Sequence, residues 1–581
     1  MRYLRMLSNS LVAALLATAY MVTLVLQLNP TLPLHPVRLV PIATTVGLFY
    51  ALHLTAIFYV LLVLRQLLAR ELFSPAWISV GVLTWFGAGA ALAGAVLMWA
   101  NLQTFELVLE PASVRHIING AIMLVVSAVL FVFVALLRAH LGTEGRPIWS
   151  AVFVAIAVLS VVAPLAVRGR GTPLLLDARP IGAPEGIGAA DRQARVTMLA
   201  VDAGSLGFIT SAAADGHLPN FGRVLDAGAV MHLATLHPTS AEAVWSAVAT
   251  GKLPQKNGVR SAGSYRFPSG GDPILLLPDY CFSHVLVRFG FLIAQPHTSA
   301  TLRTRTLWDI VGAAGVPVGV VAWPLTYPAP AVRGYLVSDA YHRLIATPSG
   351  LDDPSAVYPS DVRDEAFRAV EAATSMAEPV TRVANLEPRH LTPARTDRAY
   401  ERIAHDLAAF RPAGLSTVRY QSLDPIGHYF LRFASPTEFG DVTDEERRRF
   451  GSVLEQHYAL IDQAVGREMA SLGDEDLLLV VSGYGMEPIG VIKRLLERVA
   501  GDPELSGTHE AAPDGFLMAY GGSVARGRRT VRASIVDVVP TVLYFLGLPI
   551  GRDMDGYART DLFQRAFTDQ RPITYIPTYE R

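Results

Sequence analysis

Apolar positions are spread unevenly along the chain. The first 170 residues contain five long apolar runs with almost no charge, at about 11–28, 39–64, 77–102, 117–137 and 148–167. Each run has about 18 to 26 residues, and at about 1.5 Å per residue a helix of that length crosses a hydrocarbon layer of roughly 30 Å. Helices buried in a soluble core rarely run so long without a polar face. We therefore predict a membrane domain of five transmembrane helices over residues 1–170, with the first run retained rather than cleaved as a signal peptide.

The arginines that flank these runs indicate how the helices are oriented. Two arginines, Arg38 and Arg115, fall on one side of the predicted membrane and six fall on the other. The six are Arg2, Arg5, Arg65, Arg70, Arg138 and Arg146. Because cytoplasmic loops carry the excess of positive charge, we predict a cytoplasmic N-terminus. The odd number of spans then places everything after residue 170 outside a bacterial-type inner (plasma) membrane.

Composition narrows the classes of function. The first 170 residues hold 10 Arg, 4 Glu and no Lys or Asp. No Asp, Lys or Glu lies within a predicted span, which argues against a proton pump or an ion-coupled transporter and favours an anchor. The single cysteine, Cys281, excludes an intramolecular disulfide framework. Neither half of the chain is basic enough to predict nucleic acid as a partner, so we expect none.

From about residue 195 the apolar pattern changes to short runs typical of β-strands. These runs lie at 196–201, 318–322, 416–420, 477–482 and 515–520, and helical patterns such as 306–314 and 446–472 separate them. Alternating strands and helices predict an α/β domain with a mostly parallel central sheet covered by helices on both faces.

The composition also suggests where this α/β domain begins and ends. A stretch rich in Gly, Pro and Ala at 171–194 is predicted to be a linker. The α/β domain follows at 195–565, and residues 566–581 form a C-terminal tail. Within the domain, residues 346–396 are rich in Pro and charge and contain no strand run, so we predict an inserted cap or loop region there.

Several polar residues close to these runs could carry chemistry. Asp202 directly follows a strand run, at the edge where open α/β sheets place their sites. Asp424 and His428 are four residues apart, so on a helix they share a face and could hold one cation such as zinc. Taken alone this spacing is a weak signal, and the isolated His509 could equally be an ordinary loop residue.

Two further segments allow both a structural and a functional interpretation. Thr239 and Ser240 precede a helical stretch at 241–250. A hydroxyl at that position is usually a helix cap, but the helix dipole would also suit a nucleophile or a bound phosphoryl group. The segment Ser482-Gly483-Tyr484-Gly485-Met486 ends the strongest apolar strand run, where glycines allow a sharp turn.

Taken in chain order, these segments resemble one protein family. They are Val201-Asp202-Ala203-Gly204, Leu218-Pro219-Asn220-Phe221, Pro238-Thr239-Ser240, Trp245 to Lys252, Trp323 to Pro328, Asp424 to His428, His509, Asp537 to Thr541 and Asp553-Met554-Asp555-Gly556. The series covers about 195–563 and is similar to the type I phosphodiesterase/nucleotide pyrophosphatase branch of the alkaline phosphatase superfamily. The resemblance implies an alkaline-phosphatase-like fold. In layout only, five spans before such a domain also resemble bacterial lipid-headgroup and polyglycerol-phosphate transferases.

The resemblance further implies a site in which two zinc ions bridge a phosphoryl group. One ion would be held by Asp424, His428 and His509, all of which are present. The second would be held by Asp202, the nucleophile and an Asp-His pair, which is replaced here by Gly483-Tyr484. We therefore expect one tightly held zinc ion. A second ion would need substitute ligands, for which Glu242 and Glu487 are the candidates.

The nucleophile is the other departure from the family pattern. The resemblance implies a Thr or Ser that forms a phospho-enzyme, but the family register falls on Ala241. Ser240 and Thr239 lie one and two residues earlier. A shift of one residue at the start of a helix is easily accommodated, so we predict Ser240 as the nucleophile, with Thr239 as the alternative.

These observations predict a membrane-anchored, extracytoplasmic, metal-dependent phosphodiesterase or phosphatase-like hydrolase. Two alternatives remain open: a transferase that moves a phosphorylated lipid headgroup or glycan, and an inactive domain that binds a phosphorylated ligand or a partner. The expected substrate is a phosphorylated small molecule, lipid or glycan, and the expected surroundings are membrane lipids. The apolar segment 275–296 could lie on a membrane surface or form an ordinary helix packed on the sheet.

Overall fold

A computed structural model describes residues 1–69, 73–141, 147–169, 194–347, 353–376, 386–435, 439–500, 502–510 and 512–580. The chain divides into two compact units. The first comprises Met1–Leu176 together with Gly263–Pro296, and the second comprises Asp177–Ala262 together with His297–Arg581. Nearly all of the predicted linker, 171–194, lies outside the described residues.

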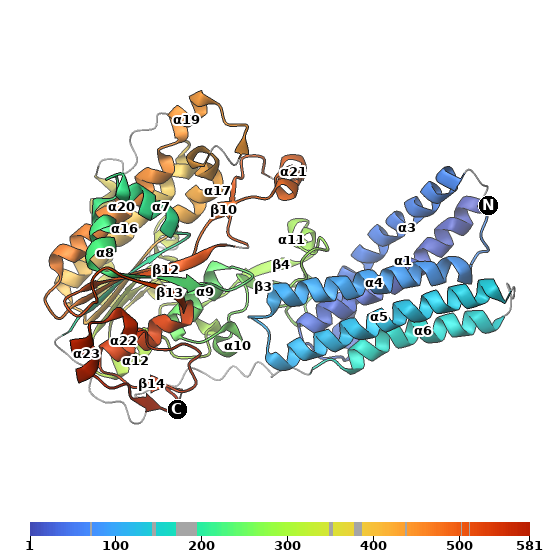
Figure 1. Cartoon of the computed structure of the whole chain (residues 1–581), viewed down its shortest axis with the longest axis horizontal. Helices are drawn as coiled ribbons and strands as arrows, with labels where there is room; N and C mark the ends of the chain where they lie inside the picture. Colours follow the sequence, from blue (N-terminus) through green and yellow to red (C-terminus); the bar gives the residue numbers. More distant parts are fainter. Residues whose placement is uncertain are drawn as a thin grey trace. The chain divides into compact units, whose positions relative to one another are not determined.

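The first unit contains the predicted apolar helices. Among the described residues, five helical segments are long and apolar enough to cross a membrane (Figure 1). They are α1 (Arg2–Leu28), the continuous segment α2–η1–α3 (Pro36–Ile42, Ala43–Gly47 and Leu48–Ala69), α4 (Val80–Phe105), α5 (Pro111–His140) and α6 (Pro147–Ala166). Large apolar side chains such as Leu92 and Val129 remain exposed on them, as expected of helices that face lipid. The prediction of five membrane-spanning helices is confirmed at the level of length and composition.

A segment from the middle of the sequence completes this unit. Its elements are β3 (Gly263–Arg266), α11 (Val285–Arg288) and β4 (Ile293–Pro296), and the two strands form an antiparallel pair. Asn29, at the end of α1, accepts hydrogen bonds from the amides of Leu275 and Leu276, both at 2.9 Å. Asn101, near the end of α4, binds the backbone of Asp279 through both ends of its amide. The alternative of a helix packed on the sheet is therefore wrong, because the apolar helices supply the partners for this backbone.

The second unit is built on a nine-stranded mixed sheet with strand order β13-β2-β12-β9-β1-β8-β5-β6-β7. Its strands are β1 (Val196–Val201), β2 (Ala229–Ala234), β5 (Val318–Val321), β6 (Gly334–Val337), β7 (Val357–Tyr358), β8 (Leu415–Tyr420), β9 (Leu477–Tyr484), β12 (Asp514–Gly521) and β13 (Arg528–Ser534). Strands β9, β1, β8, β5 and β6 are parallel, whereas β12 is antiparallel to both of its neighbours. The five predicted strand runs are all strands of this sheet.

Helices cover both faces of the sheet, as predicted (Figure 1). One layer contains α9 (Ala241–Thr250), α12 (Leu307–Ala313) and α22 (Val538–Phe545), and the other contains α7 (Leu206–Ala214), α8 (Pro219–Ala227), α16 (Pro388–Phe410) and α20 (Val453–Ser471). Strand β1 shows why both layers are needed: Met198 and Ala200 pack in the first core, while Leu199 and Val201 pack in the second. Successive residues of a strand point to opposite faces, so an all-apolar strand requires cover on both.

The remaining elements lie between these strands and helices. They are α10 (Pro254–Asn257), η2 (Ser299–Thr301), α13 (Tyr341–Leu344), η3 (Pro354–Ala356), η4 (Ser360–Val362), α15 (Arg363–Thr374), α17 (Leu423–Ala434), α19 (Asp444–Phe450), β10 (Glu487–Pro488), α21 (Val491–Ala500), β11 (Gly507–Thr508), η5 (Ile535–Asp537), β14 (Ile550–Gly551), η6 (Thr560–Leu562), α23 (Arg565–Gln570) and β15 (Tyr575–Ile576). Residues 346–396, for which we predict a cap or loop, hold strand β7 and helix α15 in their described part, and Val362 and Ala366 are buried in the core. In the predicted tail, β15 pairs with β14 and Tyr579 is buried.

Candidate active site

Three of the predicted metal ligands lie together beyond the carboxyl ends of the parallel strands. Asp424 and His428 share one face of the first turns of α17, and His509 follows β11. Asp424 Oδ2 is 3.9 Å from His428 Nε2, and Asp424 Oδ1 is 3.5 Å from His509 Nε2. The potential ligand atoms of the three residues all lie within 4.8 Å of one another. The sequence order of the motifs therefore corresponds to a real cluster in space.

Backbone contacts orient both histidines toward this cluster. Nδ1 of His428 lies 2.8 Å from the carbonyl oxygen of Gly507, and Nδ1 of His509 lies 3.2 Å from that of Thr239. A carbonyl can only accept, so each Nδ1 carries a proton, and Nε2 is the ring nitrogen that faces Asp424 and could bind a metal. This is the arrangement in which a second hydrogen bond fixes a metal-binding imidazole.

The carboxylate in the cluster also fits a cation. Asp424 Oδ1 is buried and has no hydrogen-bond partner among the described residues. Burial raises the pKa of Asp424, and the two imidazoles oppose that rise only in part. A buried carboxylate without a donor is costly, and a zinc-like ion bound by two nitrogens and one oxygen would remove that cost while leaving a position open. The three residues present therefore fit one metal ion.

The start of α17 is held by a residue that the sequence analysis did not single out. Asp397, on α16, accepts hydrogen bonds from the amides of Gln421 at 2.8 Å and Ser422 at 3.0 Å. Burial raises the pKa of Asp397 to about 7. Because these amides lie just before Asp424, Asp397 positions this candidate metal ligand without belonging to the cluster.

The two candidate nucleophiles have different environments. Ser240 is the N-cap of α9, and its Oγ accepts a hydrogen bond of 3.3 Å from the amide of Ala243. Ser240 is partly exposed, whereas Thr239 is buried and its hydroxyl donates to the carbonyl of Leu236 at 2.8 Å. The carbonyl of Thr239 is also the partner of His509. This contact brings the amino end of α9 next to the cluster. Of the two hydroxyls there, that of Ser240 is the more exposed.

Asp202 is not brought into the cluster. Its Oδ1 accepts hydrogen bonds from Trp245 Nε1 at 2.8 Å and from Arg419 Nε at 2.9 Å, and its Oδ2 accepts from Nε and Nη2 of Arg419. The side chains of Asp202 and Arg419 are only 2% and 12% exposed. Burial alone would lower the pKa of Arg419, but the Asp202 carboxylate raises it above its usual range. Asp202 therefore already has a cationic partner.

The structure also explains why residues 483 and 484 carry no metal ligands. A Cβ atom at Gly483 would lie 2.4 Å from Cγ1 of Val244 on α9, so a side chain there would require the Val244 side chain to shift. Tyr484 is fully buried, and its ring centroid is 5.2 Å from that of His509. The hydroxyl of Tyr484 has no hydrogen-bond partner among the described residues. Burial raises the pKa of Tyr484 well above its usual value, so the phenol stays neutral.

Glu242 and Glu487, the candidate substitute ligands, lie outside the three-residue cluster. Glu242 is in the first turn of α9, and burial raises its pKa. Glu487 belongs to β10 and pairs with Thr508, the residue before His509. Among the described residues, neither contributes to a group of three metal-binding side chains.

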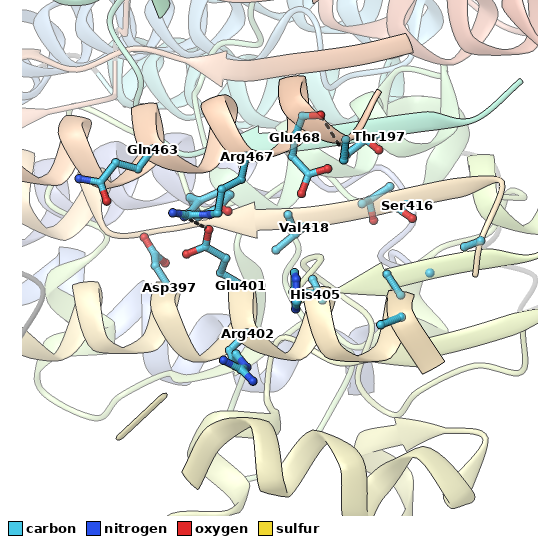
Figure 2. Close-up of a pocket in the computed structure, with 18 of the residues that line it drawn as sticks. Thr197, Asp397, Glu401, Arg402, His405, Ser416, Val418, Gln463, Arg467 and Glu468 are labelled. Carbon is cyan, nitrogen blue, oxygen red and sulfur yellow. Dashed lines mark hydrogen bonds and ion pairs between the residues drawn. The ribbon is translucent and has the colours of Figure 1, made fainter. Parts of the chain in front are cut away.

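A cavity of about 250 Å³ opens beside the cluster. Asp202, Arg419 and Asp424 line it together with His342 and Arg389. A larger cavity, of about 780 Å³, lies between α16 and α20, where Glu401 and Arg467 face each other (Figure 2). Its lining includes Thr197 and Ser416 near the amino ends of β1 and β8, away from the candidate metal ligands.

Arg419, which lines the cavity beside the cluster and pairs with Asp202, is a residue that the sequence analysis did not single out. The strand run 416–420 contains one charged residue, and a charge in a central strand buried on both faces needs a partner. In the parallel register Ala200 lies opposite Arg419, which puts Asp202 diagonally across from it on the same face. The charge inside the apolar run was the available signal.

The fold and the site define a class of protein: an α/β domain with a candidate metal site beyond the carboxyl ends of its parallel strands. The type I phosphodiesterase / nucleotide pyrophosphatase family model matches residues 197–528, and the chain belongs to this family. No curated protein matches the chain. Murine ectonucleotide pyrophosphatase / phosphodiesterase 5, solved as an inactive variant in complex with AMP, has 13% sequence identity and a TM-score of 0.36, and the match covers 64% of this chain and 100% of the murine chain.

Proposed function

We propose that this protein is a membrane-anchored phosphoric ester hydrolase that works with one metal ion and a serine nucleophile. One observation carries the proposal: Asp424, His428 and His509 form a cluster in a chain of the phosphodiesterase family, and the buried Oδ1 of Asp424 has no hydrogen-bond donor among the described residues. A zinc ion held there would supply Lewis-acid stabilisation of charge on a phosphoryl oxygen.

Ser240 is the proposed nucleophile because its hydroxyl is partly exposed at the amino end of α9. Its Oγ forms the bond to phosphorus while the bond from phosphorus to the leaving oxygen breaks, and the serine proton passes through water to that oxygen, which leaves as an alcohol. Water then cleaves the phosphoserine, which returns Ser240 and releases the phosphate. The positive end of the helix dipole at the start of α9 favours the negative phosphoryl group.

The five apolar helices support membrane anchoring, and the arginine asymmetry supports an extracytoplasmic site. A phosphorylated lipid, glycan or small molecule on the outer side of a bacterial-type inner membrane is the substrate class that fits this placement. A transferase would use the same phosphoserine with an alcohol acceptor in place of water. The product, free or lipid-linked, separates the two reactions.

The test is metal analysis combined with turnover of an aryl phosphodiester by the full-length protein in detergent micelles. We expect about one zinc per chain in the wild type, and loss of both zinc and turnover in His428→Ala. His405→Ala, in an exposed histidine of α16 paired with Asp406, is the matched control and should retain both. Zinc without turnover of any phosphodiester would refute hydrolysis and favour a domain that only binds phosphorylated ligands. Absence of zinc from the wild type would refute the metal site.

A further inference from the structure

The buried pair formed by Asp202 and Arg419 lies where the family resemblance implies a second metal ion. The pair uses both carboxylate oxygens of Asp202, as well as Nε and Nη2 of the guanidinium. Nη1 of Arg419 takes no part in this contact, and Arg419 lines the cavity beside the candidate metal cluster. The guanidinium is thus fixed on one edge and available to a ligand on the other.

The phenol of Tyr484 is a second, independent sign of a missing ligand. Its hydroxyl is buried without a hydrogen-bond partner among the described residues, which is unfavourable in a protein interior. Its ring lies beside His509, and Asp202, Asp424 and Arg419 all act electrostatically on it. A neutral phenol donates one proton and suits an anionic oxygen.

A second divalent ion does not fit this arrangement. Asp202 already accepts from Trp245 and Arg419, Gly483 supplies no ligand atom, and Tyr484 remains a neutral phenol. A zinc ion normally needs three or four protein ligands. The residues at this position therefore do not fit a second metal ion.

We infer that Arg419 and Tyr484 replace the second metal ion and bind the phosphoryl oxygens of a phosphate ester directly. The inference rests on the proposed function and specifies how its substrate is held. Arg419 supplies a permanent positive charge with donors that match phosphate oxygens. Asp202 then acts as a positioning residue that fixes the guanidinium.

The test measures zinc content and the binding of inorganic phosphate to the zinc-loaded full-length protein by calorimetry. Tyr484→Phe and the double variant Asp202→Asn/Arg419→Gln should each keep one zinc. We expect phosphate binding to weaken about 10-fold in the first and about 100-fold in the second, as lost hydrogen bonds to a charged group imply. The double variant removes both charges together, so no unpaired charge is buried and folding is preserved.

Arg195→Gln is the matched control. Arg195 binds Asp476 just before β1, at the opposite end of the strand from Asp202. Its phosphate affinity should equal that of the wild type. Unchanged phosphate affinity in both variants, with turnover retained, would overturn the inference and leave the proposed hydrolase intact. Two tightly bound zinc ions in the wild type would overturn the inference together with the one-metal part of the proposed function. Absence of zinc would refute the proposed function itself.

A separate observation concerns the segment Gly263–Pro296 of the first unit. Its residues alternate between inside and outside: Cys281 and Ser283 are buried, while Tyr280 and Phe282 are 68% and 72% exposed. Phe289 is also 69% exposed, although a large aromatic side chain in water is unfavourable. These three aromatic residues form the surface that we call the aromatic loop.

The aromatic loop is continuous with the membrane-spanning helices. The hydroxyl of Tyr280 is 3.2 Å from that of Thr104 near the end of α4, and Phe291 contacts Phe49 at the start of α3 with ring centroids 6.5 Å apart. Asn29 and Asn101 hold the same segment at the ends of α1 and α4. Aromatic residues at the ends of spans occupy the headgroup level of a bilayer. We propose that the aromatic loop inserts into the lipid interface.

The single cysteine makes this proposal directly testable. In a Cys281→Ser background, a spin label is placed at Phe282→Cys or Phe289→Cys in the full-length protein reconstituted into phosphatidylcholine/phosphatidylglycerol vesicles. Leu92→Cys on α4 is the lipid-exposed reference, and Tyr557→Cys in the second unit is the water-exposed reference. Labels on the aromatic loop should favour collisions with oxygen over a polar nickel reagent, as at Leu92. Accessibility equal to that at Tyr557 would overturn the proposal.

Discussion

The buried pair formed by Asp202 and Arg419 gives the sharpest prediction about stability. Replacing Arg419 with Gln leaves the Asp202 carboxylate 2% exposed without its counter-charge. The remaining donor is the indole of Trp245, at 2.8 Å. Breaking one side of a buried ion pair costs roughly 3 to 5 kcal/mol. The same change at Arg195 should cost no more than about 1 kcal/mol, because Arg195 is 56% exposed and Asp476 keeps two backbone donors.

Hydrogen exchange measured by mass spectrometry can report this cost locally. Peptides covering β1 and β8 should exchange roughly 100- to 3,000-fold faster in Arg419→Gln than in the wild type, by the rule of tenfold per 1.4 kcal/mol. Arg195→Gln should accelerate exchange by less than about tenfold. Asp202→Asn/Arg419→Gln should recover much of the loss, giving a coupling free energy of at least about 2 kcal/mol. If the effects of Asp202→Asn and Arg419→Gln, measured singly, add up to that of the double variant to within about 0.5 kcal/mol, the ion pair is not the source of the stability.

Three further predictions follow from other parts of the chain. Ser240→Ala should lower turnover by about 1,000-fold, or roughly 4 kcal/mol, while loss of the N-cap costs only about 1 kcal/mol of stability; near-normal turnover would exclude the covalent route. Because burial raises the pKa of Asp397 to about 7, the folded protein retains its proton where the unfolded chain has lost it. Stability should therefore fall between about pH 4 and pH 7 and level off above, by up to about 4 kcal/mol relative to Asp397→Asn in pH-dependent melts; parallel curves would contradict this. Tyr557→Cys, made in the Cys281→Ser background, should react with a membrane-impermeant maleimide from outside intact cells, and labelling only after lysis would reverse the predicted orientation.

Much of the fold could be predicted because its signals are local. The five spans follow from length and lack of charge, and the strand runs follow from short apolar stretches. Strand direction was not predictable in the same way, because a buried apolar run has the same composition in a parallel strand as in an antiparallel one. Strand β12, which is antiparallel to β9 and β2, shows this limit. The placement of Gly263–Pro296 with the apolar helices was also hidden, because it depends on Asn29 and Asn101, which are far away in sequence.

The candidate site was likewise predictable only where its residues are close in sequence. Asp424 and His428 are four residues apart on one helix, so their spacing alone suggests a shared ligand. His509 joins them only through the fold, and the family resemblance was needed to place it with them. Arg419 had no motif at all. Its partner Asp202 is 217 residues away in sequence, and the contact exists because β1 and β8 are neighbours in register. Motifs in a fixed order identify the residues that a family has in common. They cannot identify a residue such as Arg419 that takes the place of a missing family residue.

The charges around the cavity explain why one metal ion together with Arg419 could bind a phosphate ester. Asp202 and Arg419 neutralise each other, so the Asp424 carboxylate is the acidic group that a phosphate ester would meet at the cluster. Without a cation, the cluster repels a phosphate ester through this carboxylate. With a dication held by the same three residues, it becomes positive. Arg419 and Tyr484 can then donate to the phosphoryl oxygens without competing against Asp424 for the ligand. A second dication beside Arg419 would instead place two like charges in the low-dielectric interior, where their repulsion is strong.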